Sequence, residues 1–292
     1  MAQDSKIEWC NHTANLWWGC TEVHAGCDNC YARVLSHRWG FELWGNESPR
    51  RMIVSVWKDL TRYQKIAAEA GVMHTVFVGS MMDIFEKAMP LILSDGTTCT
   101  GLDTDHLRRM LFERISNGEF PNLIFLFLTK RPSNINKYIP ESWKTHPPAN
   151  VMFGTSPVNQ ETANTLIPQL AKVAGKKFLS VEPMLGPIDI TNKGIKNGYS
   201  FPTGFSELNG KRVGIEWTDP GDSFIGVDWV ICGGESGHGK RPINPDWARS
   251  LRDQCFESNQ VPFFMKQMDK VEPIPLDLFI RQFPEQFLTN QL

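Results

Sequence analysis

The sequence lacks both an export signal and a long hydrophobic run. Its opening residues, MAQDSKIEWC, contain neither the basic stretch nor the apolar core of a secretory signal. No run of about eighteen or more apolar residues is present, so no segment predicts a helix that spans a membrane. We therefore expect a soluble, cytoplasmic protein without a membrane partner.

The chain also lacks an excess of charge of either sign. Its 30 Lys and Arg residues face 32 Asp and Glu residues, and the formal net charge is -2. This balance gives no overall electrostatic case for binding nucleic acid, although it is compatible with a local basic groove. Internal repeats and low-complexity tracts are absent, and 41% of the 292 residues are hydrophobic, enough to fill a core. These features argue against a disordered or fibrous protein.

Cysteine is scarce outside one short stretch. The chain has 7 cysteines, an odd and unevenly spread set that is not typical of a secreted disulfide framework. Three of them, Cys20, Cys27 and Cys30, crowd into WWGCTEVHAGCDNCYA, residues 17–32. In a reducing compartment, such a trio more often binds a metal or does redox work than stays idle.

Short apolar runs recur along the chain, and stretches that favour helices separate them. After a first strand expected near IEW (7–9), the runs are TVFVG (75–79), LIFLFL (123–128), VMFG (151–154), KFLSV (177–181), DWVICGG (228–234) and VPFFMKQ (261–267). Helices are predicted at 105–118, 159–173 and 244–258. The last should begin with Asn244 as N-cap and Pro245 at its first position.

This alternation predicts an α/β fold built on a parallel sheet. About seven strands fall short of a full eightfold barrel, so we expect a partial (βα) TIM-like barrel of about six to seven parallel strands. An N-terminal cysteine loop would follow the first strand. A doubly wound open sheet is the alternative. We expect residues 1–292 to form a single domain, interrupted by an irregular insertion at about 190–226.

Polar residues follow each apolar run. In a parallel α/β fold the carboxyl ends of the strands face the same side, so these groups should converge on one mouth. They are Ser80, Asp83, Thr129, Lys130, Arg131, Thr155, Ser156, Glu182, Glu235, Ser236, Lys266 and Gln267. A carboxylate at the end of a buried strand needs a partner, which makes Glu182 and Glu235 the most suggestive. Lys130 and Lys266 either bind a ligand's carboxylate or phosphate or pair with these acids.

The spacing C-x6-C-x2-C gathers three soft thiolates that suit zinc or an iron–sulfur cluster. A structural zinc site needs four ligands, and His24 or Cys10 could supply the fourth. A four-iron cluster on three cysteines instead leaves one iron open. That position can bind S-adenosylmethionine, and the cofactor then carries the radical chemistry.

Further motifs resemble, in their order, those of a phage-associated, radical-SAM-like family of largely uncharacterised proteins. The family is marked by a tryptophan-rich N-terminus that leads into GCT and then GCDNCYA. The chain has WWGCTEVHAGCDNCYA, VFVGSMMDIFE, FLTKRP, GTSPVNQ, FLSVEPMLGPI, DWVICGGESG, RPINPDWARSLRDQC and VPFFMKQ. The likeness covers most of the length, apart from residues 190–226 and the C-terminal tail.

The resemblance implies a radical S-adenosylmethionine enzyme with a [4Fe-4S] cluster on Cys20, Cys27 and Cys30. S-adenosylmethionine would be cleaved to a 5′-deoxyadenosyl radical that abstracts hydrogen from an unidentified substrate. A modified nucleobase or nucleotide in phage DNA hypermodification is one candidate, and DNA itself is another. The reductant would be a flavodoxin or ferredoxin, and the location would be the host cytoplasm if the chain is phage-encoded.

The chain departs from the wider superfamily around the cofactor. The first cysteine gap is six residues where three is usual, and Asn29 occupies the aromatic position before the last cysteine. Tyr31 is then the candidate for stacking on adenine. The GGE segment at 233–235 follows a late strand where the superfamily has it after the second. The methionyl contacts are therefore expected from GSMMD, residues 79–83.

The expected cofactor-binding residues are the strand-end groups together with Tyr31. Ser80 and Asp83 would contact the methionyl moiety, and Glu182 or Thr155 would meet the ribose hydroxyls. The other candidates are Thr129, Lys130 and Glu235.

A second hypothesis is a zinc-stabilised module that binds a ligand or nucleic acid without radical chemistry. In that case Cys20, His24, Cys27 and Cys30 would hold the N-terminal loop together. Replacing His24 by alanine should damage the zinc site and leave a three-cysteine cluster almost unaffected.

Overall fold

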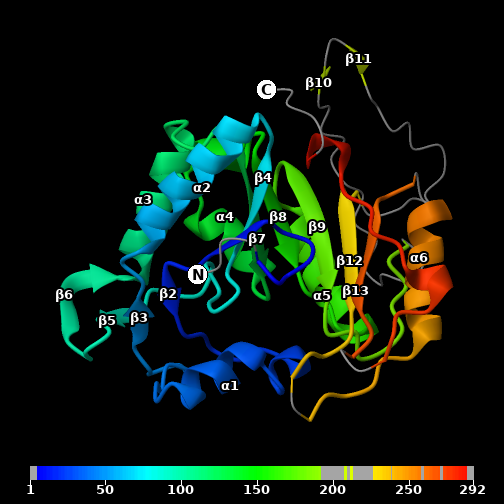
Figure 1. Cartoon of the computed structure of the whole chain (residues 1–292), viewed down its shortest axis with the longest axis horizontal. Coiled ribbons are helices and arrows are strands. Elements are labelled where there is room, and N and C mark those ends of the chain that lie inside the picture. The colour runs from blue at the N-terminus through cyan, green and yellow to red at the C-terminus, as the bar shows by residue number, and fades with distance from the viewer. Residues whose placement is uncertain are drawn as a thin grey trace.

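A curled sheet of seven parallel strands forms the centre of the computed structural model (Figure 1). The structure describes residues 5–191, 207–208, 211–212, 226–237, 239–257, 260–269 and 272–287. The sheet has the order β1-β4-β7-β8-β9-β12-β13, and every neighbouring pair is parallel. Its strands are β1 (His12–Ala14), β4 (His74–Val78), β7 (Leu123–Thr129), β8 (Val151–Thr155), β9 (Lys176–Val181), β12 (Trp229–Gly233) and β13 (Phe263–Gln267). The curl makes a half-barrel, which confirms the predicted partial α/β barrel at this level.

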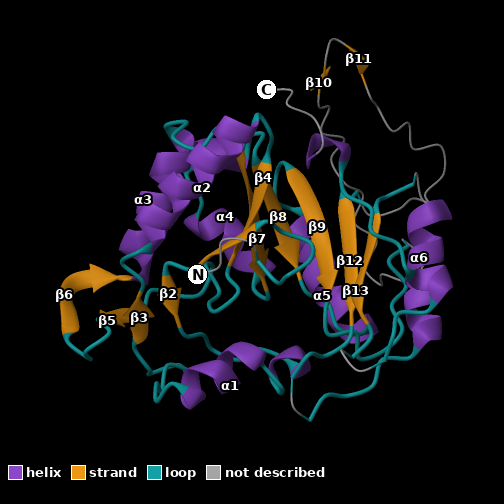
Figure 2. Ribbon diagram, viewed as in Figure 1, coloured by secondary structure: helices purple, strands orange, loops and turns teal. Residues whose placement is uncertain are grey.

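The two faces of the sheet bury different sets of side chains, as the period of two along a strand requires. On the inner face, Phe77, Leu126 and Phe178 belong to a small, largely aromatic cluster. On the outer face, Phe127 and Leu179 join the larger core that packs against the helices. The helices are α2 (Val56–Ala70), α3 (Thr104–Ser116), α4 (Ile135–Tyr138), α5 (Gln160–Ala171) and α6 (Pro245–Glu257), and most of them lie outside the curl (Figure 2).

The predicted later strands and helices are confirmed, with boundaries shifted by one or two residues. Pro245 opens α6, and the side chain of Asn244 accepts a hydrogen bond from the backbone N–H of Asp246 at 2.9 Å, as expected of an N-cap. Most of the predicted insertion lies outside the described residues, namely 192–206, 209–210 and 213–225. Inside it, β10 (Glu207–Leu208) and β11 (Lys211–Arg212) pair as antiparallel strands.

The prediction of a first strand at residues 7–9 was wrong. These residues form a turn, and the first strand is β1, a few residues later. The apolar signal at Ile7 and Trp9 has another cause, because Trp9 packs into the inner cluster with its ring 4.6 Å from Phe77 and 6.1 Å from Trp229. Strand β1 has the polar sequence His-Thr-Ala, although all three residues are buried, so no apolar run marks it.

A second sheet carries the cysteine loop. It has the order β2-β3-β5-β6, built from β2 (Trp17–Trp18), β3 (Arg50–Met52), β5 (Pro90–Ile92) and β6 (Thr98–Asp103). The cysteine loop, residues 19–30, runs from β2 to helix α1 (Tyr31–Arg38). Short 3₁₀ turns η1 to η5 occur at Ala25–Cys27, Pro132–Asn134, Glu141–Lys144, Leu276–Leu278 and Glu285–Phe287. The sequence analysis predicted neither this sheet nor α1 and α2.

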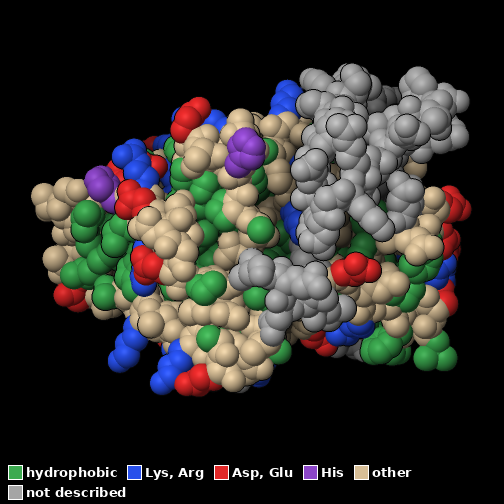
Figure 3. Space-filling view, turned by 90° about the horizontal axis from the view of Figure 1, so that it is seen from above, with side chains coloured by type: hydrophobic (Ala, Val, Ile, Leu, Met, Phe, Trp, Pro, Cys, Tyr) green, Lys and Arg blue, Asp and Glu red, His purple; other side chains and the backbone are tan. Residues whose placement is uncertain are grey.

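Acidic and basic side chains are interspersed on the described part of the face seen in Figure 3, in keeping with the balanced net charge. Among the described residues, no helix is both long and apolar enough to cross a membrane.

Candidate functional site

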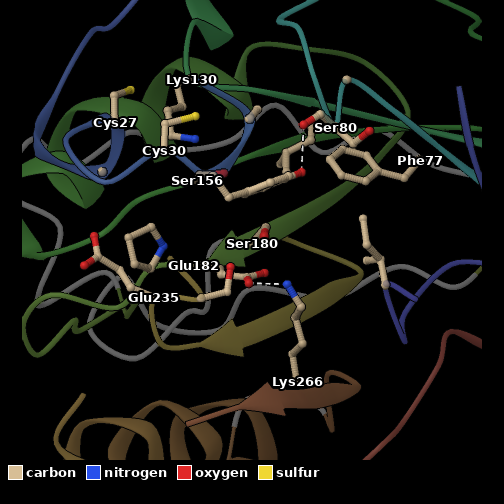
Figure 4. Close-up of a pocket in the computed structure, with 18 of the residues that line it drawn as sticks. Cys27, Cys30, Phe77, Ser80, Lys130, Ser156, Ser180, Glu182, Glu235 and Lys266 are labelled. Carbon is tan, nitrogen blue, oxygen red and sulfur yellow. Dashed lines mark hydrogen bonds and ion pairs between the residues drawn. The ribbon is translucent and has the colours of Figure 1, made fainter. Parts of the chain in front are cut away.

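A cavity of about 630 Å³ opens at the carboxyl ends of the parallel strands. This volume falls within the roughly 300–1,000 Å³ of small-molecule and cofactor sites. Cys20, Cys27 and Cys30 all line it. In Figure 4, Cys27 and Cys30 lie on one side of the cavity, whereas Glu182, Glu235 and Lys266 lie on the other. The prediction that the cysteine loop faces the strand ends is therefore confirmed as a geometric statement.

Arg131 holds the first cysteine against the ends of β4 and β7. Its Nη1 donates to Asp83 Oδ2 at 2.7 Å and lies 3.9 Å from Cys20 Sγ, while Nη2 donates to the carbonyl of Thr21. Asp83 also accepts from the hydroxyl of Thr129 at 2.7 Å. Burial, reinforced by Asp83 and a second nearby carboxylate, raises the pKa of the Cys20 thiol to about 12, and the Arg131 guanidinium opposes this rise.

A buried ion pair between Arg50 and Glu86 supports the start of the cysteine loop. Arg50 is 0% exposed and Glu86 is 1% exposed, and Arg50 Nε and Nη2 each donate to the Glu86 carboxylate at 2.8 Å. Arg50 Nη2 also donates to the Thr21 hydroxyl at 3.0 Å and to the Gly45 carbonyl at 3.1 Å. Gly19 must be glycine here, because its φ is +115° and a Cβ would lie 2.7 Å from Arg50 Cδ.

Glu235 holds the middle of the loop. It accepts from Asn29 Nδ2 at 2.9 Å and from the backbone N–H of Arg241 at 2.7 Å, and it pairs with the Arg241 guanidinium. Arg241 continues to Asp28 Oδ2 at 3.0 Å and to the carbonyl of Ala25 at 2.8 Å. Burial acts to raise the pKa of Glu235, but the hydrogen bonds from Arg241 and Asn29 outweigh it and hold that pKa below its usual value.

Four further predicted residues, Glu182, Lys266, Tyr31 and Ser80, line the cavity. Glu182 and Lys266 form an ion pair across the ends of β9 and β13, and each side chain is about 15% exposed. Tyr31 also lines the cavity, and its hydroxyl donates to the carbonyl of Ser80 at 2.7 Å. The Ser80 hydroxyl accepts from Asn15 Nδ2 at 2.8 Å. These contacts bring Tyr31, Ser80 and Glu182 to one cavity, as predicted.

Two expectations from the strand ends are altered. Thr155 is fully buried, does not line the cavity, and donates its hydroxyl to the carbonyl of Thr129 at 2.8 Å, so it is not placed to meet a ribose. The sequence pair Gly233-Gly234, at the end of β12, predicts that a ligand can approach the backbone closely. At Gly234 the protein's own backbone already fills this space, because a Cβ there would lie 1.8 Å from the carbonyl oxygen of Met268.

His24 caps the turn before Cys27. Its Nδ1 accepts from the backbone N–H of Gly26 at 3.1 Å, while its buried Nε2 has no hydrogen-bond partner among the described residues. Burial, together with the positive charges of Lys130 and Arg131, lowers the pKa of His24 to about 4. Unlike the three cysteines, His24 does not line the cavity.

The donor set of the loop fits an iron–sulfur cluster in type and number. All three cysteines are free thiols, half-buried, on one loop and at one cavity. Thiolates are the usual ligands of such clusters. Within the described residues, no three His, Cys, Asp or Glu side chains are close enough together to hold a single metal ion. A closed structural zinc site needs four ligands, one more than the three thiols of the loop.

Sequence reasoning missed the residues that fasten the loop. Arg50 and Glu86 are almost completely buried charges that meet across 36 positions, and Asn29 reaches Glu235 across 206. The one signal for Arg50 was the charged segment RRM (50–52) in front of an amphipathic helix, and such a segment is equally compatible with an exposed polar stretch. Only the fold shows which charge is buried.

The comparisons with known proteins identify a family but no activity. A model of the family described as "Protein of unknown function (DUF5131)" matches residues 4–281. No curated protein matches the chain, and no solved structure does.

Proposed function

The chain belongs to the DUF5131 family, and we propose that this member is a radical S-adenosylmethionine enzyme. The observation that supports the proposal is the placement of Cys20, Cys27 and Cys30 on one loop that lines the strand-end cavity of a half-barrel. Three thiolates would hold a [4Fe-4S] cluster and leave one iron without a protein ligand. A structural zinc site would need a fourth protein ligand, and a disulfide would use only two of the three thiols.

The bound cofactors would supply the reaction's electron and radical. When bound, the cluster would pass one electron from a flavodoxin or ferredoxin to S-adenosylmethionine. The chemistry that this supplies is cleavage of S-adenosylmethionine to methionine and a 5′-deoxyadenosyl radical that can take hydrogen from the substrate. The protein's part is to hold the ligands and keep water away. We place the reaction in the cytoplasm, where such reductants operate, with a nucleotide or DNA as the substrate class.

The residues around the cavity would share the binding of S-adenosylmethionine. The ring of Tyr31 offers a face for adenine. Ser80 keeps its hydroxyl hydrogen for the methionyl group, since its oxygen only accepts from Asn15. Glu182 shares one carboxylate oxygen with Lys266, which leaves the other for a ribose hydroxyl. Asp83 and Glu235 would act indirectly, because their carboxylates already hold Arg131 and Arg241.

The zinc-stabilised module is the second candidate, and the orphaned Nε2 of His24 is the observation in its favour. That nitrogen is the one ligand atom left on His24, because Nδ1 already caps the turn. The position of His24 outside the cavity that the cysteines line speaks against a shared metal.

Anaerobic purification separates the two candidates. A brown protein with about four irons per chain and absorption near 400 nm supports the cluster. The variants Cys20→Ala, Cys27→Ala and Cys30→Ala should each lose most of that iron, while Cys99→Ala, a half-buried thiol outside the loop, should keep it. Colourless wild-type protein that carries one zinc, and loses it in His24→Ala, would contradict the proposal.

A further inference from the structure

Three side chains form a row along the wall of the cavity, at the ends of three neighbouring strands. They are Lys130 after β7, Ser156 after β8 and Ser180 near the end of β9, and we call them the polar row. The residue immediately before each is paired in register with its neighbour on the next strand. All three line the cavity and are labelled in Figure 4. The parallel register therefore brings them side by side, with about 4.8 Å between adjacent strands.

The polar row has no partner within the part of the chain that the structure describes. Ser156 is 1% exposed and its hydroxyl makes no hydrogen bond. Ser180 is 2% exposed, and neither its hydroxyl nor the Lys130 ammonium has a hydrogen-bond or ion-pair partner there. A buried polar group without a partner costs about 1–3 kcal/mol, and such groups are rare in native proteins. Ser156 is such a group. The Ser180 hydroxyl and the half-buried Lys130 ammonium lie in register with it and are also unpartnered among the described residues, so the row indicates a place that a ligand completes.

Three other cations of the cavity wall are already neutralised. Arg131 pairs with Asp83, Lys266 with Glu182, and Arg281 with Glu8. Lys6 also lines the cavity, but it is exposed to solvent. Lys130 is half-buried and has no carboxylate partner in the described part of the chain. A ligand that meets it should bring negative charge of its own.

The composition of the row favours phosphate over carboxylate. A phosphate offers several oxygens in tetrahedral directions and can accept from an ammonium and two hydroxyls at once. A carboxylate is matched best by the planar fork of arginine, whereas lysine binds phosphate as a point charge. Beneath the row, Leu126, Met152 and Phe178 form the apolar inner cluster, which excludes water and strengthens such an interaction.

We propose that Lys130, Ser156 and Ser180 bind a phosphate group of the substrate. The identification of the ligand as the substrate rests on the proposed radical function, and it narrows the substrate class to phosphorylated molecules such as nucleotides. Phosphate binding itself depends on the strand ends alone and requires no cluster.

Titration with inorganic phosphate, followed by ³¹P NMR, tests the row in the full-length, anaerobically purified protein. Lys130→Met should weaken binding roughly tenfold or more, because it removes a hydrogen bond to a charged group. The double variant Ser156→Ala with Ser180→Ala should weaken it roughly threefold or more. Lys6→Met is the matched control. It removes the same charge from an exposed lysine that also lines the cavity, and it should change the affinity less than about twofold.

Equal weakening in Lys130→Met and Lys6→Met would overturn the proposal, since general electrostatics would then explain the binding. So would Lys130-dependent binding of L-methionine in place of phosphate, because the row would then take a carboxylate. The iron content of the same samples reports on the radical function separately. If the protein contains no iron but binds phosphate through Lys130, the polar row is a phosphate site and the proposed cluster is contradicted. If the protein contains iron but binds phosphate equally well without Lys130, the phosphate site is contradicted and the proposed cluster is supported.

Discussion

Two parts of the cavity wall use their polar groups in opposite ways. The cysteine loop is tied to the barrel by charged side chains that are fully engaged, above all Arg50, Arg131 and Arg241. Among the residues that the structure describes, the polar row beside it leaves an ammonium and two hydroxyls without partners. The first arrangement stabilises a loop that must hold its shape, while the second gives up stability that a ligand can restore. Substitutions should therefore affect folding strongly in the loop's supports and hardly at all in the polar row.

The largest effect is expected from the buried pair behind the loop. Arg50→Met should lower the free energy of unfolding by about 3–5 kcal/mol, because it leaves Glu86 as an uncompensated buried charge. Urea unfolding measures the loss. The control is Lys65→Met, whose exposed pair with Glu69 should contribute no more than about 1 kcal/mol. A similar loss of unfolding free energy in both variants would contradict the claim that the buried pair contributes more to stability than the exposed pair.

A smaller effect should follow from loosening the middle of the loop. Arg241→Gln removes the partner of Glu235 and the contacts to Asp28 and Ala25, and we expect a loss of about 1–2 kcal/mol. Hydrogen exchange should increase in residues 25–30 while β12 stays protected. Unchanged exchange in the loop would show that Arg241 does not fasten it.

His24 should contribute a pH dependence of about 1 kcal/mol, once solvent screening at this half-buried site is allowed for. Its pKa falls from 6.5 to about 4 on folding, so the unfolded chain binds the proton more tightly. The contribution to stability is complete above pH 6.5 and is lost as the pH falls toward 4. His24→Asn keeps a hydrogen-bond acceptor for the Gly26 N–H but does not titrate. In this variant the urea midpoint of unfolding should depend less on pH over this range. A midpoint profile equal to that of the wild type would exclude His24 as the cause.

The smallest effect on folding is expected in the polar row. Ser156→Ala removes a buried hydroxyl that has no hydrogen-bond partner in the described part of the chain, so the free energy of unfolding should change by less than about 0.5 kcal/mol or rise. Thr155→Val is the matched comparison, since the neighbouring hydroxyl donates to the Thr129 carbonyl. It should cost about 1 kcal/mol. A larger loss for Ser156 than for Thr155 would mean that Ser156 has a structural role.

The part of the fold that follows from local pattern was predictable from the sequence. Runs such as LIFLFL and KFLSV are buried on both faces, and they became β7 and β9. The polar segment at β1 was not predictable, because its His-Thr-Ala sequence gains its burial only from neighbouring elements. Helix α1 was not predictable either. Tyr31 and Val34 in the helix, and Trp39 directly after it, are exposed and do not form an apolar stripe.

The candidate site also has a part that the sequence predicted and a part that it did not. The sequence placed Cys20, Cys27, Cys30 and the strand-end residues at one mouth, since parallel strands bring their carboxyl ends together. Which of these groups is engaged depends on contacts between distant segments. Glu235 is occupied by Arg241 and Asn29, and Thr155 turns away from the cavity. One position later, Ser156 has no hydrogen-bond partner among the described residues. Strand register and long-range ion pairs decide these roles, and neither can be read from local spacing.

Product analysis after a single turnover tests the radical proposal most directly. Anaerobic protein with a reconstituted cluster would be mixed with S-adenosylmethionine and dithionite, and the quenched solution analysed for 5′-deoxyadenosine and methionine. We expect both products in equal amounts from the wild type and neither from Cys27→Ala. Protein that carries the cluster, binds S-adenosylmethionine and forms no 5′-deoxyadenosine under these conditions would contradict the proposed function.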